Sequence, residues 1–460
     1  MEQISNYINA NEKQYREKWF EALRIPSVSA QPEHKDDVKK MANWLADYIR
    51  NELHFESRVI STDHHPLVYG ESPKIEGAPT ILFYGHFDVQ PVDPIHEWIS
   101  PPFEPTIRNG NVYCRGADDD KGQLLTHLFS VKSFIETQTP LPVQIKYILE
   151  GEEEVGSKSL AQFLLKEENR QLLAADVIIV SDNTMISFEK PTITYGLRGL
   201  AGFELTLIGP NRDLHSGLFG GSVYNPAIAL SKIIAAIIDE NGKIQIPEFY
   251  DDIIDITDLE HKAFANLDVD EKEFLAAVGL KDNFGEPEYT PIERRCGRPS
   301  FDINGLTSGY QGNGSKTIIP AWASAKFTFR LVPNQTPEKI TKNVREFIEK
   351  RLPPGIQMKL EYNHGAPGMV VPLDSQYVTA AAKSLEKIFQ HKIVFTRDGG
   401  SIPIVAELKD KLKSEVLLIG FGFDDDAIHS PNEKFALESF RRGIQTSAAL
   451  IEEIGKLQLS

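Results

Sequence analysis

The feature of this chain that most constrains its fold is a series of short apolar runs bounded by polar residues or glycine. They cover residues 80–84, 143–149, 177–180 and 416–419. Runs of this length predict strands that are buried on both faces. Because helical patterns such as residues 123–136 and 159–173 separate them, we expect an α/β fold with a mostly parallel sheet flanked by helices.

The pattern of apolar residues changes between residues 202 and 362. Phe203, Leu205 and Leu207 alternate with other residues, and a similar alternation recurs at residues 325–329. Alternation of this kind predicts strands with two distinct faces. With an acidic, proline-containing segment between them, these strands predict an inserted α+β domain over residues 200–370, flanked by the first domain at 1–199 and 371–460.

Composition excludes several classes of protein. The formal net charge of −17 repels phosphate backbones and anionic lipids, which argues against nucleic-acid or membrane-surface binding. Cys114 and Cys296 are the only cysteines, so neither a disulfide framework nor a cysteine-based zinc site is expected. The first thirty residues carry charges throughout and no apolar run is long enough to span a bilayer, so we expect a soluble cytoplasmic protein.

Side chains able to bind metal ions follow each of the four apolar runs. His86 and Asp88 follow the first run, Glu152 to Glu154 the second, Asp182 the third, and His429 lies beyond the fourth. The carboxyl ends of parallel strands meet at one edge of an open α/β sheet. We therefore expect these residues to share one crevice.

Acidic triplets need a second interpretation, because such triplets are usually solvated turns. Residues 118–120 come just before a predicted helix, and residues 152–154 follow a strand. A solvated role is the alternative for both triplets. Residues 424–426 follow Gly-Phe rather than a strand, and we interpret them as solvated acids.

Histidines and carboxylates without thiolates suit zinc, manganese or cobalt. Two ions held close together require one bridging carboxylate and a terminal set for each ion. Such a pair polarises a carbonyl group and lowers the pKa of bound water. A carboxylate that is not a ligand must then accept the proton of that water.

A series of short motifs runs from about residue 80 to the C-terminus. The motifs are GHFDVQP (85–91), GADDDKG (116–122), LEGEEEVGS (149–157), SDN (181–183), TYGLRG (194–199), DLHSG (213–217), KTIIP (316–320), RLVPN (330–334), GGSIP (399–403) and IHSPNEK (428–434). In their order and approximate spacing they resemble those of the M20 metallopeptidase family, and especially its cytosolic nonspecific dipeptidase and carnosine dipeptidase branch.

The resemblance implies a metal-dependent hydrolase that cleaves dipeptides or short peptides with two divalent ions, zinc or manganese. His86, Asp119 and Asp182 are implied to hold one ion, and Asp119, Glu154 and His429 the other. Asp119 is then the bridge, chosen because it begins the DDKG match. The first domain becomes the catalytic domain, and the insertion becomes a lid and dimerisation domain.

The remaining roles also come from the resemblance. Asp88 is implied to bond His86 and fix its tautomer, and Glu153 to serve as general base and then general acid. The acids Glu150 and Glu152 have no role in the family, and we interpret them as structural.

Substrate contacts are implied in the insertion and near its end. His215 is implied to reach the active site of a partner subunit, which requires a homodimer. Arg330 is implied to bind the substrate carboxylate through its planar fork, and Thr317 and Ser401 to contact the substrate. For Thr317 and Ser401 a purely structural role in turns is the alternative.

Three other functions are alternatives. Residues 309–317 come close to a phosphate-binding loop, but Ser315 stands where lysine should follow Gly314. An N-acyl amino acid amidohydrolase could use the same metal centre. A catalytically silent metal-binding or scaffold protein is disfavoured because Glu153 is present. The sequence leaves open the preferred substrate side chains, the choice between zinc and manganese, and the physiological substrate class.

Overall fold

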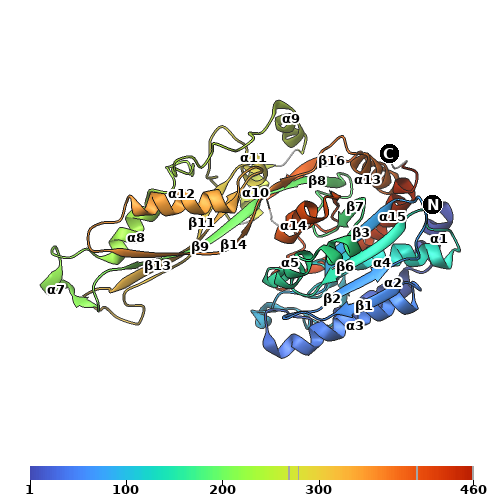
Figure 1. Ribbon diagram of the computed structural model, residues 1–460, viewed down its shortest axis with the longest axis horizontal. Coiled ribbons are helices and arrows are strands. Elements are labelled where there is room, and N and C mark those ends of the chain that lie inside the picture. Colours follow the sequence, from blue (N-terminus) through green and yellow to red (C-terminus); the bar gives the residue numbers. More distant parts are fainter. Residues whose placement is uncertain (268–269, 278, 400–401, 458–460) are drawn as a thin grey trace. The chain divides into compact units, whose positions relative to one another are not determined.

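The computed structural model describes residues 1–267, 270–277, 279–399 and 402–457 (Figure 1). The chain forms two compact units. Unit 1 comprises Met1–Tyr195, Val371–Thr396 and Glu407–Ser460, and unit 2 comprises Gly196–Val370 and Arg397–Ala406.

The four apolar runs form the centre of a sheet in unit 1. They are β3 (Thr80–His86), β6 (Gln144–Glu150), β7 (Val177–Val180) and β17 (Glu415–Leu418). Their order is β6-β3-β7-β17, and all three neighbouring pairs are parallel. The antiparallel strands that flank this centre are β1 (Glu56–Ile60) and β2 (Leu67–Glu71) on one side and β8 (Thr192–Leu197) on the other. The predicted α/β fold with a mostly parallel sheet is confirmed.

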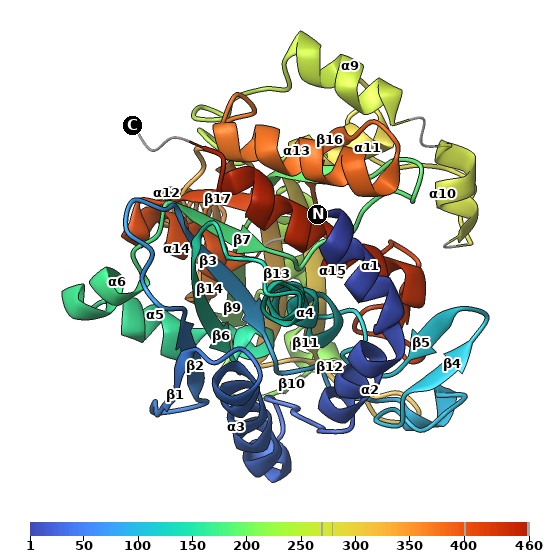
Figure 2. The same ribbon diagram turned by 90° about the vertical axis from the view of Figure 1, so that its right-hand side faces the viewer.

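Helices cover both sides of this sheet, with α4 and α15 on one side and α5 and α6 on the other (Figure 2). Helix α4 is almost entirely buried and apolar around much of its surface, as a helix enclosed by other elements must be. The helices of unit 1 include α1 (Glu2–Ala10), α2 (Glu12–Leu23), α3 (Lys35–Asn51), α4 (Lys121–Glu136), α5 (Lys158–Leu164), α6 (Glu167–Leu173), α13 (Gln376–Phe389) and α15 (Leu437–Ile454). Within the described residues, none of the helices combines the length and apolar character needed to cross a membrane.

The helical pattern predicted over residues 159–173 is two helices rather than one. Lys166 has an extended backbone, with φ −84° and ψ 130°, and it separates α5 from α6. A smaller three-stranded sheet in the same unit joins β18 (Lys434–Ala436) to β5 (Asn111–Tyr113) and β4 (Thr106–Arg108). That sheet brings two segments more than 300 residues apart side by side.

Unit 2 is built on a four-stranded antiparallel sheet in the order β11-β13-β9-β14. The alternating residues identified in the sequence point into its core, where Phe203, Leu205 and Phe327 pack with α8 and α12. The elements are β9 (Gly199–Ile208), β11 (Ser300–Ser308), β13 (Trp322–Leu331), β14 (Gln357–Ala366), α8 (Pro226–Ala235) and α12 (Pro337–Glu349).

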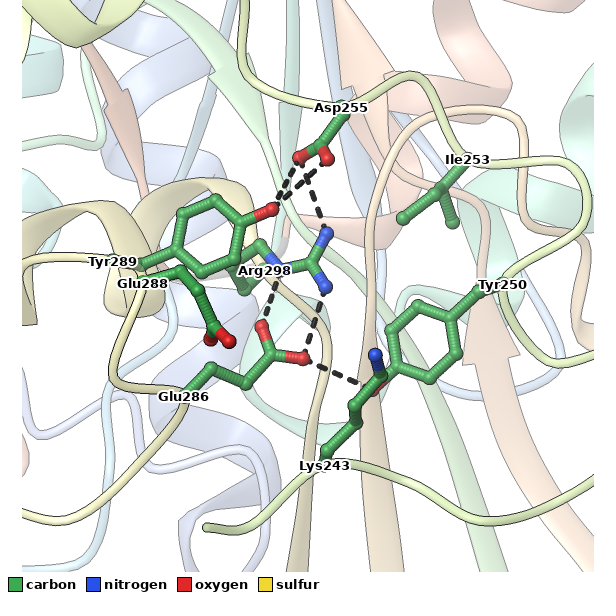
Figure 3. Close-up of a pocket in the computed structure, with 8 residues that line it drawn as sticks. All are labelled: Lys243, Tyr250, Ile253, Asp255, Glu286, Glu288, Tyr289 and Arg298. Atoms are coloured by element: carbon green, nitrogen blue, oxygen red, sulfur yellow. Dashed lines mark hydrogen bonds and ion pairs between the residues drawn. The ribbon is translucent and has the colours of Figure 1, made fainter.

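The acidic segment that precedes β11 folds around one arginine. Arg298 donates from Nε to Glu286 at 2.5 Å and from Nη2 to the same carboxylate at 2.9 Å, and Nη1 lies 3.2 Å from Asp255 (Figure 3). Its guanidinium carbon is 4.4 Å from the ring centre of Tyr289 and 5.3 Å from that of Tyr250. These groups line a cavity of about 630 Å³. The positive charge of Arg298 in this cavity is balanced by the carboxylates of Glu286 and Asp255.

We expect Arg298→Met to lower the free energy of unfolding by about 3 kcal/mol, because it leaves Glu286 buried without its partner. Both side chains are less than one tenth exposed. The matched control is Arg298→Met combined with Glu286→Leu, which removes both charges and is expected to restore most of the loss. Guanidinium unfolding measures both variants, and an equal loss in the single and double variants would contradict the pairing.

Candidate metal centre

The five predicted metal ligands all lie in unit 1, at the ends of the central strands or in adjoining loops. His86 is the last residue of β3, and Asp182 lies two residues beyond β7. Asp119 precedes α4, whereas Glu154 belongs to the short 3₁₀ turn Glu153–Val155 that follows β6. His429 lies in the loop between β17 and β18. The fold therefore brings together five side chains separated by up to 343 residues of sequence.

The first group of potential ligands surrounds His86. Its Nε2 atom lies 3.0 Å from Oδ1 of Asp119 and 3.8 Å from Oδ1 of Asp182. Potential ligand atoms of the three residues lie within 4.8 Å of one another. Burial opposes charging of His86, but hydrogen bonds to Asp119 and Asp182 raise its pKa well above the ordinary value.

The second group surrounds His429 and shares Asp119 with the first. Nε2 of His429 lies 2.9 Å from Oδ2 of Asp119 and 3.2 Å from Oε2 of Glu154. Hydrogen bonds to these two carboxylates raise the pKa of His429 to about 10. The two oxygens of Asp119 thus face different histidines, which is the arrangement that a bridging ligand requires.

The donor set fits two divalent cations. Three carboxylates and two imidazoles converge. Imidazoles bind metal ions in their neutral form, so as ligands the five groups carry an excess of negative charge that cations would balance. Oε1 of Glu154 is buried and has no hydrogen-bond partner among the described residues. Imidazole and carboxylate donors without thiolates suit zinc or manganese.

Asp88 contacts the residues around the centre through both its backbone oxygen and its carboxylate, and its predicted bond to His86 stays compatible with this geometry. The nearest acceptor for Nδ1 of His86 is the backbone oxygen of Asp88 at 3.1 Å, while the carboxylate lies 3.5 Å away. A bond from Nδ1–H to that carbonyl leaves Nε2 free as a ligand. The Asp88 carboxylate also accepts hydrogen bonds from the backbone N–H groups of Glu153 at 3.2 Å and Glu154 at 3.1 Å.

Glu153, the predicted base, lies beside the ligands and is not a member of either group. It begins the 3₁₀ turn that also carries Glu154, and it is partly exposed. Lost hydration raises the pKa of Glu153, His86 opposes that rise, and Asp182 reinforces it. Glu153 therefore shares its turn with one candidate ligand, and its role as a base stays a prediction.

The alternative interpretation, in which the acidic triplets lie in solvated turns, is wrong at several positions. Asp118 and Asp120 are buried beside Asp119, and Oδ2 of Asp120 accepts the backbone N–H of His86 at 3.2 Å. Asp426 was interpreted as solvated but is fully buried, because its carboxylate lies 2.7 Å from Nζ of Lys434 and accepts the N–H of Phe423. The other two acids of that triplet are exposed.

The predicted substrate residues that the structure describes lie in unit 2. His215 is exposed on β10 (Leu214–His215), and its Nδ1 accepts the backbone N–H of Gly217 at 3.0 Å. The neutral ring therefore carries its proton on Nε2, from which it can donate to a substrate oxygen. Thr317 is also exposed and is close by, because its carbonyl accepts the N–H of Ser216 at 3.1 Å.

Arg330 lies on β13, far along the sheet from that pair. It is opposite Leu200 on β9 and Ser300 on β11, and burial lowers its pKa. Ser401 lies outside the described residues. The substrate roles of His215, Thr317, Arg330 and Ser401 stay predictions.

Two positioning contacts were missed in the sequence. Nε2 of Gln90 donates to Oε2 of Glu154 at 2.6 Å. Nε2 and Nδ1 of the buried His127 lie 2.9 Å from the hydroxyls of Ser181 and Ser447 respectively. Gln90 lies within the GHFDVQP motif, which is a signal that could have identified it. His127 lies within a helical pattern that predicts only packing.

The sequence matches the profile of Peptidase family M20/M25/M40 over residues 82–453. The chain belongs to this family. Membership confirms the predicted resemblance and makes the protein a hydrolase. The arrangement of two candidate ion sites that share Asp119 is therefore found in a member of a metallopeptidase family.

Relatives within the family are similar over nearly the whole chain. The Cys-Gly metallodipeptidase dug1 of Schizosaccharomyces pombe is 31% identical, with 99% of each chain covered. The human Beta-Ala-His dipeptidase is 30% identical over 99% of this chain and 93% of its own. The structure of the M20 metallo-carboxypeptidase Sso-CP2 from Sulfolobus solfataricus has a TM-score of 0.88 and is 32% identical, covering 96% of this chain and 99% of its own.

Proposed function

We propose that this protein hydrolyses the peptide bond of dipeptides and short peptides, using two divalent ions, zinc or manganese. His86, Asp119 and Asp182 hold one ion in this proposal, and Asp119, Glu154 and His429 hold the other. The observation that carries it is the placement of the two Asp119 oxygens, which lie 3.0 Å and 2.9 Å from different histidines. The names of the relatives described above support a dipeptide as substrate.

The protein's own residues supply proton transfer and orientation. Two divalent ions held by these five residues would supply polarisation of the scissile carbonyl and make a water molecule more acidic. Glu153 accepts the proton of the attacking water and then delivers it to the leaving amine. Asp88 holds the backbone of Glu153 and Glu154 through its two carboxylate oxygens. The base and one metal ligand therefore keep a fixed spacing.

Arg330 binds the C-terminal carboxylate of the substrate in this proposal, because a planar guanidinium presents two parallel donors to a carboxylate. Thr317 and Ser401 add substrate contacts. Units 1 and 2 then act as a catalytic domain and a lid and dimerisation domain. The two cysteines are free and buried, which supports a reducing compartment such as the cytoplasm.

We also propose a homodimer in which His215 acts at the active site of the partner subunit. Arg330 is opposite Leu200, whereas Trp322, at the other end of β13, is opposite Ile208. Eight residues of extended strand span about 27 Å. His215 lies beyond that far end, where β10 pairs with β12 (Ile318–Ile319) and α7 (Ser216–Phe219) begins (Figure 1).

A dipeptide is only about 7 Å long. One substrate molecule therefore cannot touch both Arg330 and His215 of the same chain, so a His215 that acts on it must come from a second copy. Exposed apolar side chains on unit 2 support such an association, since they offer surface for burial. They include Leu218, Ile228, Leu306 and Trp322.

Mixed dimers test this sharing of sites. His215→Ala and Glu153→Gln homodimers are each expected to be nearly inactive, because every site lacks one group. A mixed dimer contains one site with both defects and one with neither. About a quarter of wild-type activity should therefore return in a fully exchanged equimolar mixture, in which half of the dimers are mixed, and about a half in isolated mixed dimers. Steady-state assays after subunit exchange measure this recovery. Mixtures that stay as inactive as their parents would contradict a shared site.

The proposed activity is tested by assaying purified protein against dipeptides, tripeptides and N-acyl amino acids, together with elemental analysis for bound metal. Dipeptide turnover that disappears with a chelator and returns with zinc or manganese is expected. Faster cleavage of N-acyl amino acids would instead identify an amidohydrolase, because the same centre can cleave either amide. A protein that holds no divalent ion would refute the proposal.

A further inference from the structure

Glu433 is a fully buried carboxylate that belongs to neither group of candidate ligands. It follows His429 by four residues, in the same loop. Its Oε1 accepts the backbone N–H groups of Asp118 at 3.0 Å and Asp119 at 3.2 Å. Glu433, which lies in the loop that carries His429, therefore binds the backbone at Asp119. The carboxylate of Asp119 is the one that lies between His86 and His429.

The second oxygen of Glu433 connects to a third loop through Arg115. Oε2 accepts the N–H of Gly116 at 3.0 Å and Nη1 of Arg115 at 2.7 Å. Arg115 is only 1% exposed, and its Nη2 donates to the carbonyl of Pro91 at 3.0 Å. Pro91 ends the motif that carries His86, so one ion pair contacts all three segments.

The backbone reinforces these contacts. The carbonyl of Glu433 accepts the N–H of Cys114 at 3.0 Å. Immediately afterwards β18 pairs with β5, with Lys434 opposite Tyr113. The segment leading to Asp119 is thus fixed to the His429 loop by both its main chain and its side-chain contacts.

We propose that Glu433, with Arg115 as its counter-ion, is a positioning residue that fixes the spacing between Asp119, His429 and His86. This inference rests on the proposed function, because it concerns the metal ligands. A buried ion pair is weak support for stability, since apolar side chains of similar volume often serve as well. Only an acceptor with two charged oxygens, however, can collect three backbone N–H groups and a guanidinium at one point.

Glu433→Gln tests the role with little change in shape. In either orientation the amide nitrogen faces two N–H donors, so two hydrogen bonds are lost and Arg115 loses its counter-charge. We expect affinity for both ions to fall about 10–100-fold, as is typical when a group that orients metal ligands is replaced. The Michaelis constant for a dipeptide at saturating metal should change little, because Glu433 does not contact substrate.

Calorimetric titration of the metal-free protein with Mn²⁺ or Zn²⁺ alone measures the affinities, and circular dichroism of the metal-free forms reports folding. Glu293→Gln is the matched control. Glu293 is 5% exposed in unit 2, where it accepts the backbone N–H of Thr290 at 2.7 Å and lies 2.6 Å from His261. This control is expected to affect stability and leave metal affinity unchanged.

Wild-type affinity for both ions in a folded Glu433→Gln variant would overturn the inference. If that variant does not fold, Arg115→Lys provides the test, because it keeps the charge but cannot reach both Glu433 and Pro91. Unchanged metal affinity in Arg115→Lys would then overturn the inference. Failure of the proposed function is distinguishable, since the wild-type protein itself would then bind no ion pair or cleave no dipeptide.

Discussion

Glu153→Gln is expected to lower kcat for dipeptide hydrolysis by about 10²–10⁴-fold while the protein keeps both ions, because general acid–base catalysis contributes on this scale. Glutamine preserves the size of the side chain but cannot accept the proton of the attacking water. Glu153 is absent from both groups of candidate ligands, so metal content should stay at the wild-type level. Steady-state kinetics and elemental analysis of the same preparation measure the two quantities.

The neighbouring Glu152 offers a matched control. It is 3% exposed, and its Oε2 accepts the backbone N–H of Ser159 at 3.1 Å. Glu152→Gln keeps an oxygen for that bond, so activity should change far less than in Glu153→Gln. Loss of metal from the Glu153 variant would show that Glu153 is a ligand rather than the base.

Much of the sheet in unit 1 was predictable, because strands buried on both faces are mostly apolar. The run at 177–180 matches β7 residue for residue, and the other three runs match their strands to within two residues at either end. The break at Lys166 was not predictable in the same way. Neither glycine nor proline marks it in residues 159–173, so no local signal separates α5 from α6.

The convergence of the candidate ligands was predictable because their motifs resemble those of a family, and because the ends of parallel strands meet at one edge of the sheet. The buried state of Asp426 and the contacts of Glu433 were not predictable from the sequence. Glu433 bonds to a loop 315 residues earlier in the chain, so local sequence holds no sign of its partners. Burial of such carboxylates is decided by tertiary contacts, whereas an acidic residue in a loop ordinarily predicts exposure.

Asp119→Ala is expected to deplete both ions and to lower kcat/KM by about 10³-fold or more, since the ions supply several kcal/mol of stabilisation to the transition state. Each oxygen of Asp119 faces a different histidine. Removing the carboxylate therefore takes one donor from each candidate site. Elemental analysis of the dialysed protein gives the metal content of each chain.

Asp182→Ala is the comparison that isolates the bridge. Asp182 belongs only to the group around His86, so its loss should weaken one ion and leave the group of Asp119, Glu154 and His429 complete. Both variants remove one carboxylate of similar exposure, 11% for Asp119 and 15% for Asp182, which makes their general cost to the fold similar. If Asp119 bridges the two sites, Asp119→Ala should lose two ions and Asp182→Ala only one. If Asp119→Ala kept one ion as firmly as Asp182→Ala does, Asp119 would be a terminal ligand, and the two sites would not be joined through it.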